Sequence, residues 1–339
     1  LICLCAVIKA VDTYAALLRV TVASAANDHR LGSHEAPPAI ISIYLGEQLN
    51  DIIEQIEKGA LKGATKEGTL EVGIDSLPPL PRHASDRNRT SPFAFTGSKF
   101  EFRAVGSSQS LSGPNVVLNM IVADALKDIC DELENVSKKD LNKTVQKLLQ
   151  SIIKKHKRVI FNGDNYTEAW VKEAKKRGLP NNVSTPEALE AIKDPAVAPL
   201  FERHKVLNKT EVISRYDTYK EQYNTIINYE AALSVDMAKT MFIPAAVAYA
   251  EGLSASVKSI EGVNKGSLKG IRAILKEVSK YTEAAIASAD KLEKAVAGGK
   301  STAIIAVMKE LRGHVDALEA LLPKDAWPVP SYTEMLFMS

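Results

Sequence analysis

Lys99-Phe-Glu-Phe-Arg-Ala-Val105 is the clearest strand pattern in the 339-residue chain. Successive side chains of a strand point to opposite faces, so the three charged residues share one face and the apolar residues share the other. From about residue 114 to residue 322, apolar residues instead recur at helical spacing. A mixed region with strands, followed by a long helical region, predicts an α+β fold.

The composition is that of an ordinary globular protein. Hydrophobic residues make up 45% of the chain, enough for a sizeable core, and the formal net charge of +2 gives no electrostatic footprint for nucleic acid. The apolar residues 1–6 are too few to span a bilayer and lack the order of a secretory signal. We therefore expect no nucleic-acid or membrane partner, a cytoplasmic location, and a chain that begins inside a domain.

The cysteine count is low and odd, which does not suit a disulfide framework. We predict that Cys3, Cys5 and Cys130 are all reduced, buried thiols.

Several segments carry strong secondary-structure patterns. Residues 18–23 alternate and are β-branched, which predicts a strand. The helical patterns cover residues 47–58, 115–134, 140–156, 210–250, 267–296 and 301–322. Gly298-Gly299 separates the last two and predicts an antiparallel helical hairpin. The sequence Gly298-Gly-Lys-Ser-Thr302 lacks the first glycine and the preceding strand of a phosphate-binding loop, so we exclude that function for it.

Two polar stretches precede the strand at residues 99–105. Asn27-Asp-His-Arg-Leu-Gly-Ser-His-Glu-Ala-Pro-Pro38 is either a solvated turn or a binding loop. Asp86-Arg-Asn-Arg-Thr-Ser-Pro92 places two guanidinium groups in one turn, which suits a phosphate or carboxylate, although an isolated Arg-x-Arg is more often a basic surface turn. The charged face of the strand is likewise either an ion network on a wet sheet or a floor that binds metal, phosphate and carboxylate.

Taken in order, the three stretches resemble the catalytic core of the glutamine synthetase family. The chain shows Arg30…Glu35-Ala-Pro37, then Arg87-Asn-Arg-Thr90, then Lys99-Phe-Glu-Phe-Arg103. The spacing between the first two stretches and the long helical tail ending in Trp327-Pro-Val-Pro-Ser-Tyr332 are similar to the type III class. The resemblance implies an ATP-dependent ligase that joins ammonia to glutamate through a γ-glutamyl phosphate.

The resemblance also implies roles for single residues. Arg30, Gly32 and Arg103 match positions that hold substrate glutamate, and Glu35 matches the flap glutamate that closes the site and takes a proton from ammonium. Closure of such a flap would exclude water, which would otherwise hydrolyse the acyl phosphate.

Four further positions match groups around ATP and metal. Arg89 corresponds to the arginine that steadies the transferring phosphoryl group, and Arg87 and Lys99 are assigned with it to the ATP phosphates. Glu101 corresponds to a carboxylate that binds Mg²⁺ or Mn²⁺. The bacterial type I pattern of the family differs in having an arginine where Ala94 stands here.

The resemblance implies a division into residues 1–136, part of a catalytic β-sheet domain whose N-terminal half is missing, and residues 137–339, a helical C-terminal domain. The family's β-grasp domain, its early metal-binding glutamates and its histidine motif are not in the sequence. We therefore expect the chain alone to be inactive, and the parent protein to be a homo-oligomer, a ring-based dodecamer by resemblance.

Two other interpretations stay open on the residues alone. The chain could be a non-catalytic helical assembly protein that keeps remnants of ligase motifs. It could also belong to a related carboxylate–amine ligase, since an arginine set suits any substrate with carboxylates. Glu35 favours ammonia over a bulky amine, because deprotonating ammonium needs a base.

Overall fold

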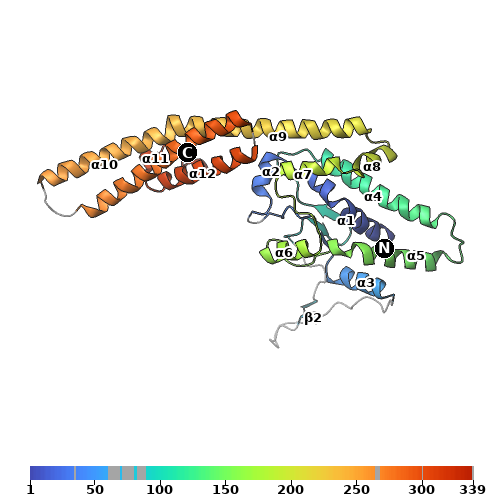
Figure 1. The fold of residues 1–339 in the computed structure, drawn as a ribbon. Helices are drawn as coiled ribbons and strands as arrows, with labels where there is room; N and C mark the ends of the chain where they lie inside the picture. The colour runs from blue at the N-terminus through green and yellow to red at the C-terminus, as the bar shows by residue number, and fades with distance from the viewer. Residues whose placement is uncertain are drawn as a thin grey trace. The chain divides into compact units, whose positions relative to one another are not determined.

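The computed structural model describes residues 1–33, 36–59, 89–263, 268–299 and 301–337, and the backbone of residues 69–70 and 80–81. It divides into two compact units, Leu1–Lys220 and Glu221–Ser339. Both are mainly helical, and a small sheet lies in the first, so the chain is a mostly helical protein with a small sheet (Figure 1).

Helix α1 (Ile2–Val20) is the centre of the first unit, and most of its side chains are buried. The predicted strand at residues 18–23 is wrong, because this helix runs on to Val20. Burial explains the difference: Leu18 and Val20 pack in the main core, and such packing overrides the weak strand preference of β-branched residues.

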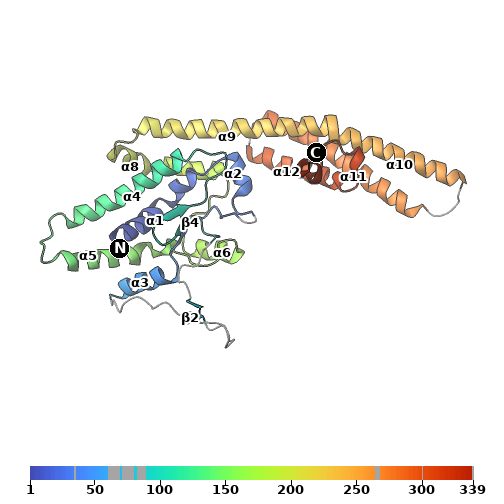
Figure 2. The same ribbon diagram turned by 180° about the vertical axis from the view of Figure 1, so that it is seen from behind.

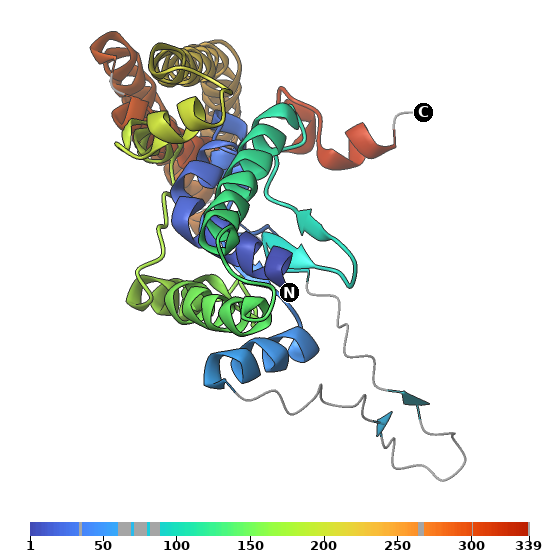
Figure 3. The same ribbon diagram turned by 90° about the vertical axis from the view of Figure 1, so that its right-hand side faces the viewer.

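Helices surround α1 on several sides. It packs against α4 (Ser112–Leu133), α5 (Leu141–His156) and α7 (Thr185–Leu189). Helix α3 (Glu47–Lys58) lies against α5, as the blue and green helices of Figure 3 show. The other helical segments of the unit are α2 (Ala25–Arg30), η1 (Lys157–Val159), α6 (Glu168–Lys176), η2 (Glu190–Lys193), α8 (Val197–Arg203) and the first part of α9 (Lys209–Met237).

The main sheet has the order β1-β4-β5 and lies beside α1 (Figure 2). Strand β1 (Ile43–Tyr44) pairs in parallel with β4 (Phe93–Phe95), which pairs in antiparallel fashion with β5 (Phe100–Phe102). A separate pair joins β2 (Thr69–Leu70) to β3 (Leu80–Pro81). The strand predicted at residues 99–105 is confirmed over Phe100–Phe102, and residues 103–105 lie outside it.

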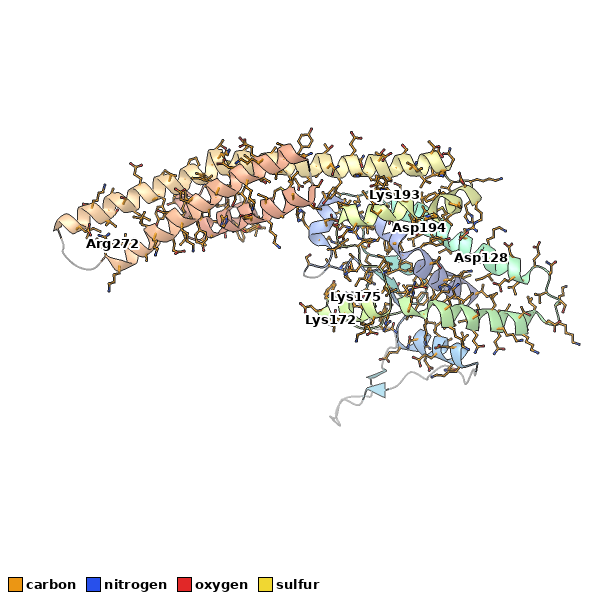
Figure 4. All side chains as sticks on the ribbon, in the orientation of Figure 1. Asp128, Lys172, Lys175, Lys193, Asp194 and Arg272 are labelled. Carbon is orange, nitrogen blue, oxygen red and sulfur yellow. The ribbon has the colours of Figure 1, made fainter. Side chains whose placement is uncertain are left out.

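Buried charges on α1 find partners on neighbouring helices. Asp12 is 6% exposed and accepts from Arg158 Nε at 2.7 Å, with His156 Nδ1 at 2.8 Å from its other oxygen. Lys9 Nζ lies 2.8 Å from Asp128, which Figure 4 labels on α4. The Tyr14 hydroxyl donates to Asp124, and burial, with that carboxylate beside it, raises the pKa of Tyr14 to about 12.

The second unit contains the rest of α9, the π-helix η3 (Ala238–Phe242), α10 (Ile243–Val263), α11 (Lys269–Gly298), α12 (Ser301–Glu319), η4 (Lys324–Ala326) and α13 (Tyr332–Leu336). Helices α11 and α12 pack along each other, and Gly299 between them has the left-handed φ of 68°. The predicted hairpin is confirmed, and Ile304, Leu311 and Leu318 of the predicted seam are fully buried.

The three cysteines differ in their exposure to solvent. Only Cys5 is buried, while Cys3 and Cys130 are exposed, so the prediction of three buried thiols is wrong for two of them. Burial raises the pKa of Cys5 to about 11.

The predicted boundary between residues 136 and 137 concerns domains of a family and stays a prediction. Along the chain, the first compact unit ends at Lys220, because α5 packs on α1 and α3 and so belongs to the same unit as they do.

The buried pair of Arg19 and Asp28 generates a prediction about stability. The side chains are 2% and 15% exposed, and breaking such a pair leaves an uncompensated charge. Arg19→Met should therefore lower the free energy of unfolding of the first unit by about 3–5 kcal/mol. Urea unfolding followed by Trp170 fluorescence, in a Trp327→Phe background, measures this change in the first unit alone.

Lys127→Met is the matched control, because Lys127 pairs with Asp131 across an exposed helix face and should change stability by less than about 0.5 kcal/mol. Equal losses of unfolding free energy in the two variants would show that burial does not make the Arg19–Asp28 pair more important than an exposed pair.

Candidate active-site surface

The hairpin of β4 and β5 carries the predicted charged row. Gly97, with a φ of 91°, allows the turn, and the Thr96 N–H donates to the Lys99 carbonyl at 2.9 Å. Phe93 stacks on Phe100 with ring centroids 4.9 Å apart, which fixes the apolar face against the core. The charged side chains of β5 are therefore held on the opposite face.

Glu101 is the hub of that face. Its carboxylate accepts from Arg103 Nη2 at 2.9 Å and Nε at 3.2 Å, and Lys99 Nζ lies 3.4 Å away. Glu101 is 37% exposed and Arg103 is 22% exposed. The hydrogen bond from Arg103, followed by that from Lys99, lowers the pKa of Glu101 below its usual 4.5, so the carboxylate stays ionised at neutral pH.

The polar stretch from Asn27 is tied to the end of β5. Asn27 is 1% exposed, and its amide nitrogen donates to the carbonyls of Val22 at 2.7 Å and Ala104 at 3.0 Å. Leu31 packs with Val22 and Ala104 in a small apolar cluster. Arg30 and Gly32 flank Leu31 in sequence, so the backbone that carries them is fixed beside the residue that follows Arg103.

Gly32 closes the turn after α2. It has a φ of 76°, which favours glycine, and its N–H donates to the Pro37 carbonyl at 3.1 Å. The exposed Arg30 is the last residue of α2. Glu35, the predicted flap glutamate, lies outside the described residues, as does Arg87.

The stretch that contains Arg89 runs directly into β4. The exposed Arg89 accepts at its carbonyl from the Tyr166 hydroxyl at 3.3 Å, and the Thr90 hydroxyl accepts from the Asn165 N–H at 3.0 Å. The Arg103 N–H donates to the Pro92 carbonyl at 2.8 Å. The second and third stretches are therefore neighbours in the sheet.

Two asparagines that sequence reasoning missed hold the ends of β1, and one of them also binds the stretch that leads into β4. Asn162 Oδ1 accepts from the N–H groups of Leu45 and Gly46 at 3.0 and 3.2 Å, at the end of β1. Asn165 is 1% exposed, and its Oδ1 accepts from Ser42 at 2.7 Å. The only signal in the sequence was the cluster Asn162-Gly-Asp-Asn165, which is typical of a turn. It does not indicate which residues the two asparagine side chains bind.

Ala94 stands where the bacterial type I pattern has an arginine. It is 1% exposed and lies in the middle of the sheet, paired with Tyr44 on one side and Glu101 on the other. An arginine side chain would not fit this buried position without a shift of neighbouring groups.

The described residues do not by themselves fit a divalent cation. They contain no group of three or more His, Cys, Asp or Glu side chains able to hold a metal. Glu101 offers one carboxylate, and Arg103 and Lys99 already neutralise it. Mg²⁺ and Mn²⁺ prefer several oxygen ligands, so further carboxylates would have to come from elsewhere.

Comparison with known proteins identifies relatives of the chain. Residues 144–261 match the model of the glutamine synthetase C-terminal domain. The chain is 40% identical over 99% of its length to a type-3 glutamine synthetase of Dictyostelium discoideum, and 38% identical over 99% to a glutamine synthetase of Butyrivibrio fibrisolvens. The chain resembles, over nearly its whole length, the C-terminal portion of glutamine synthetases.

The chain spans about half the length of these relatives, 48% and 50% respectively. A glutamine synthetase of Bacteroides fragilis is 31% identical over 95% of the chain and is covered to 47%. The resemblance to the type III class, in its C-terminal portion, is thereby confirmed. The roles given to single glutamine synthetase positions, from Arg30 to Arg103, stay predictions.

The charge environment of Glu101 gives a testable pH dependence. A carboxyl pKa that is lower in the folded state stabilises that state above the unfolded pKa, and this contribution disappears as pH falls through the folded value. Carbon-13 NMR titration of labelled glutamate carboxyl groups, assigned with Glu101→Gln, should give Glu101 a midpoint below 4.5.

Arg103→Gln should raise that midpoint towards the usual value, because the Arg103 hydrogen bond is the largest cause of the shift. Arg215→Gln is the control, since Arg215 donates to the Glu211 carbonyl instead. If Arg103→Gln leaves the titration midpoint of Glu101 unchanged, the pair of Arg103 and Glu101 does not form in solution.

Proposed function

We propose that the chain supplies part of the active site of a glutamate–ammonia ligase that uses ATP. The observation that supports this is the convergence of three motif stretches on one hairpin. Asn27 ties the first to Ala104, and the Arg89 stretch leads into β4, which pairs with the strand carrying Glu101 and Arg103. The similarity to glutamine synthetases is what assigns a chemical role to this arrangement.

In the proposed reaction, a side-chain carboxylate oxygen of glutamate attacks the γ-phosphorus of ATP, and the bond to ADP breaks. Glu35 takes a proton from ammonium, the ammonia so formed attacks the acyl carbon, and phosphate leaves as hydrogen phosphate, carrying the nitrogen's extra proton. The guanidinium groups of Arg30 and Arg103 bind the carboxylates of glutamate, because each presents paired donors. Arg89, with Arg87 and Lys99, neutralises the phosphoryl oxygens.

A divalent cation, when bound, would neutralise phosphate charge, and Glu101 would be its ligand from this chain. In the structure Arg103 and Lys99 hold this carboxylate, so the other oxygen ligands of such a cation would come from elsewhere. We also propose that the protein is a cytoplasmic homo-oligomer, ring-based and dodecameric. The three cysteines are free thiols, as expected where glutathione keeps thiols reduced.

The catalytic-sheet identity of β1, β4 and β5 belongs to the same proposal. The DNA upstream of the Leu1 codon tests it first. An open frame that encodes a β-grasp domain, paired glutamates and a histidine motif is expected. The absence of such a frame would favour the non-catalytic assembly protein.

Activity assays divide the remaining alternatives. The full product of the gene should form glutamine from glutamate, ammonia and ATP, and the 339-residue chain alone should not. Glutamine formation by the chain alone would contradict the claim that it holds only part of a site. Product formation with another amine or acid, but not with ammonia and glutamate, would identify a related carboxylate–amine ligase.

Arg103→Lys in the full product should raise the KM for glutamate about 10- to 100-fold, because lysine keeps the charge but loses the paired donors. Arg215→Lys, on an exposed helix face, should leave KM unchanged. A wild-type KM in the Arg103 variant would remove this residue from the substrate site.

A further inference from the structure

Residues 144–261, which match the glutamine synthetase C-terminal domain and which we call the matched region, are not a separate body in this chain. The first compact unit extends to Lys220, so the earlier part of the matched region is folded together with the three motif stretches. Two short segments of the matched region, residues 162–166 and 182–185, contact two of these stretches directly. Each segment contacts a different stretch.

The earlier segment holds the backbone that carries Arg89. The Tyr166 hydroxyl donates to the Arg89 carbonyl at 3.3 Å. The Asn165 N–H donates to the hydroxyl of the next residue, Thr90, at 3.0 Å. The segment is itself fixed, because the buried Asn165 accepts from the Ser42 hydroxyl at 2.7 Å, beside the start of β1. The exposed Arg89 is therefore carried on backbone that the matched region holds.

The later segment holds α2, the helix that ends at Arg30 and lies beside α7 in Figure 1. The Asp28 carboxylate accepts from the Thr185 N–H at 2.7 Å and from the Thr185 hydroxyl at 2.8 Å. Thr185 is 2% exposed, so these contacts are shielded from water. Asn27 ties the same helix to the end of β5. A helix of six residues has little stability of its own, so these two tethers set where it lies.

We propose that Tyr166 and Thr185 are positioning residues, through which the matched region sets the places of Arg89 and Arg30 in the site. The inference rests on the proposed ligase, because it takes the roles of the two arginines from there. Tyr166 and Thr185 act through the backbone that carries these arginines and not on the substrates themselves. Placement matters for such groups, since a shift of about 1 Å caused by a distant change can cost about 100-fold in rate.

The two contacts serve different steps of the reaction. Arg89 acts on the phosphoryl group during its transfer, so a displaced Arg89 weakens the transition state and lowers kcat. Arg30 binds a carboxylate of glutamate before and during the reaction, so a displaced Arg30 raises the KM for glutamate. Partial unfolding would instead reduce the amount of active enzyme and leave KM unchanged. Each positioning residue therefore has its own kinetic signature.

Tyr166→Phe in the full gene product tests the contact with Arg89. The variant loses only a hydroxyl, and kcat should fall about 3- to 10-fold while the KM for glutamate stays unchanged. Tyr216→Phe is the matched control, because the Tyr216 hydroxyl donates to Glu190 at 2.7 Å instead, and its kcat should equal that of the wild type. A wild-type kcat in Tyr166→Phe would remove Tyr166 from the proposal.

Thr185→Val tests the contact with Asp28. Valine keeps the size of the side chain and the N–H contact, and the loss of the hydroxyl should raise the KM for glutamate about 3- to 10-fold with kcat unchanged. Thr185→Ser, which keeps the hydroxyl, should have the wild-type KM. Thr282→Val is the control, since this equally buried hydroxyl donates to a carbonyl within α11. A raised KM in Thr185→Ser as well would assign the effect to packing and contradict the proposal.

Hydrogen–deuterium exchange without ligands separates this proposal from the ligase itself. Tyr166→Phe should speed exchange about 2- to 10-fold in peptides covering residues 89–95 and leave residues 25–32 unchanged, and Thr185→Val should do the reverse. A wild-type gene product that forms no glutamine would contradict the ligase, and the exchange rates would still show whether the two side chains hold their stretches. Wild-type exchange in both peptides of both variants would overturn the positioning roles, whatever the activity.

Discussion

The contact between Arg19 and Asp28 is the constraint on which the first unit depends. Arg19 is almost completely buried in α1, and it donates to the Asp28 carboxylate and to the carbonyls of Asn182 and Val183. Asp28 also accepts from the N–H and hydroxyl of Thr185, at the start of α7. One buried ion pair therefore joins three helices. It also fixes α2, whose Asn27 neighbours Asp28, next to the strand that carries the charged row. Burial lowers the pKa of Arg19, so the folded state needs the Asp28 carboxylate to keep this guanidinium paired.

The site surface is organised by side-chain amides rather than by a long sheet. Each strand contributes only two or three paired residues, which is little backbone pairing for a surface that must hold charges in place. Asn27, Asn162 and Asn165 compensate, because each links a loop to a residue close to the end of a strand. The packed phenylalanines of β4 and β5 add rigidity from the apolar side. The charged face can therefore hold Glu101 and Arg103 together without burying either, which suits a surface completed by groups from elsewhere.

Much of the fold follows from the sequence, and the exceptions have physical causes. The helix at Glu47–Lys58 and the α11–α12 hairpin were predictable, since periodic apolar residues and a glycine turn act locally. Residues 18–23 were misjudged because the burial of α1 depends on distant helices. The charged row on β5 was predictable from alternation alone. The tethers of Asn27 and Asn165 were not, because their partners lie 77 and 75 residues away in sequence. The sequence around an asparagine does not indicate which distant residue its side-chain amide binds.

The central claim is that this hairpin and the stretch tied to it by Asn27 form part of a site for glutamate and ATP. Hydrogen–deuterium exchange of the full gene product, with and without ATP, Mg²⁺ and glutamate together, tests it most directly. The account predicts slower exchange in peptides covering residues 27–38 and 87–105, and unchanged exchange in α11 and α12 of the same molecules. Unchanged exchange in the first two regions, with protection confined to other parts of the protein, would contradict it.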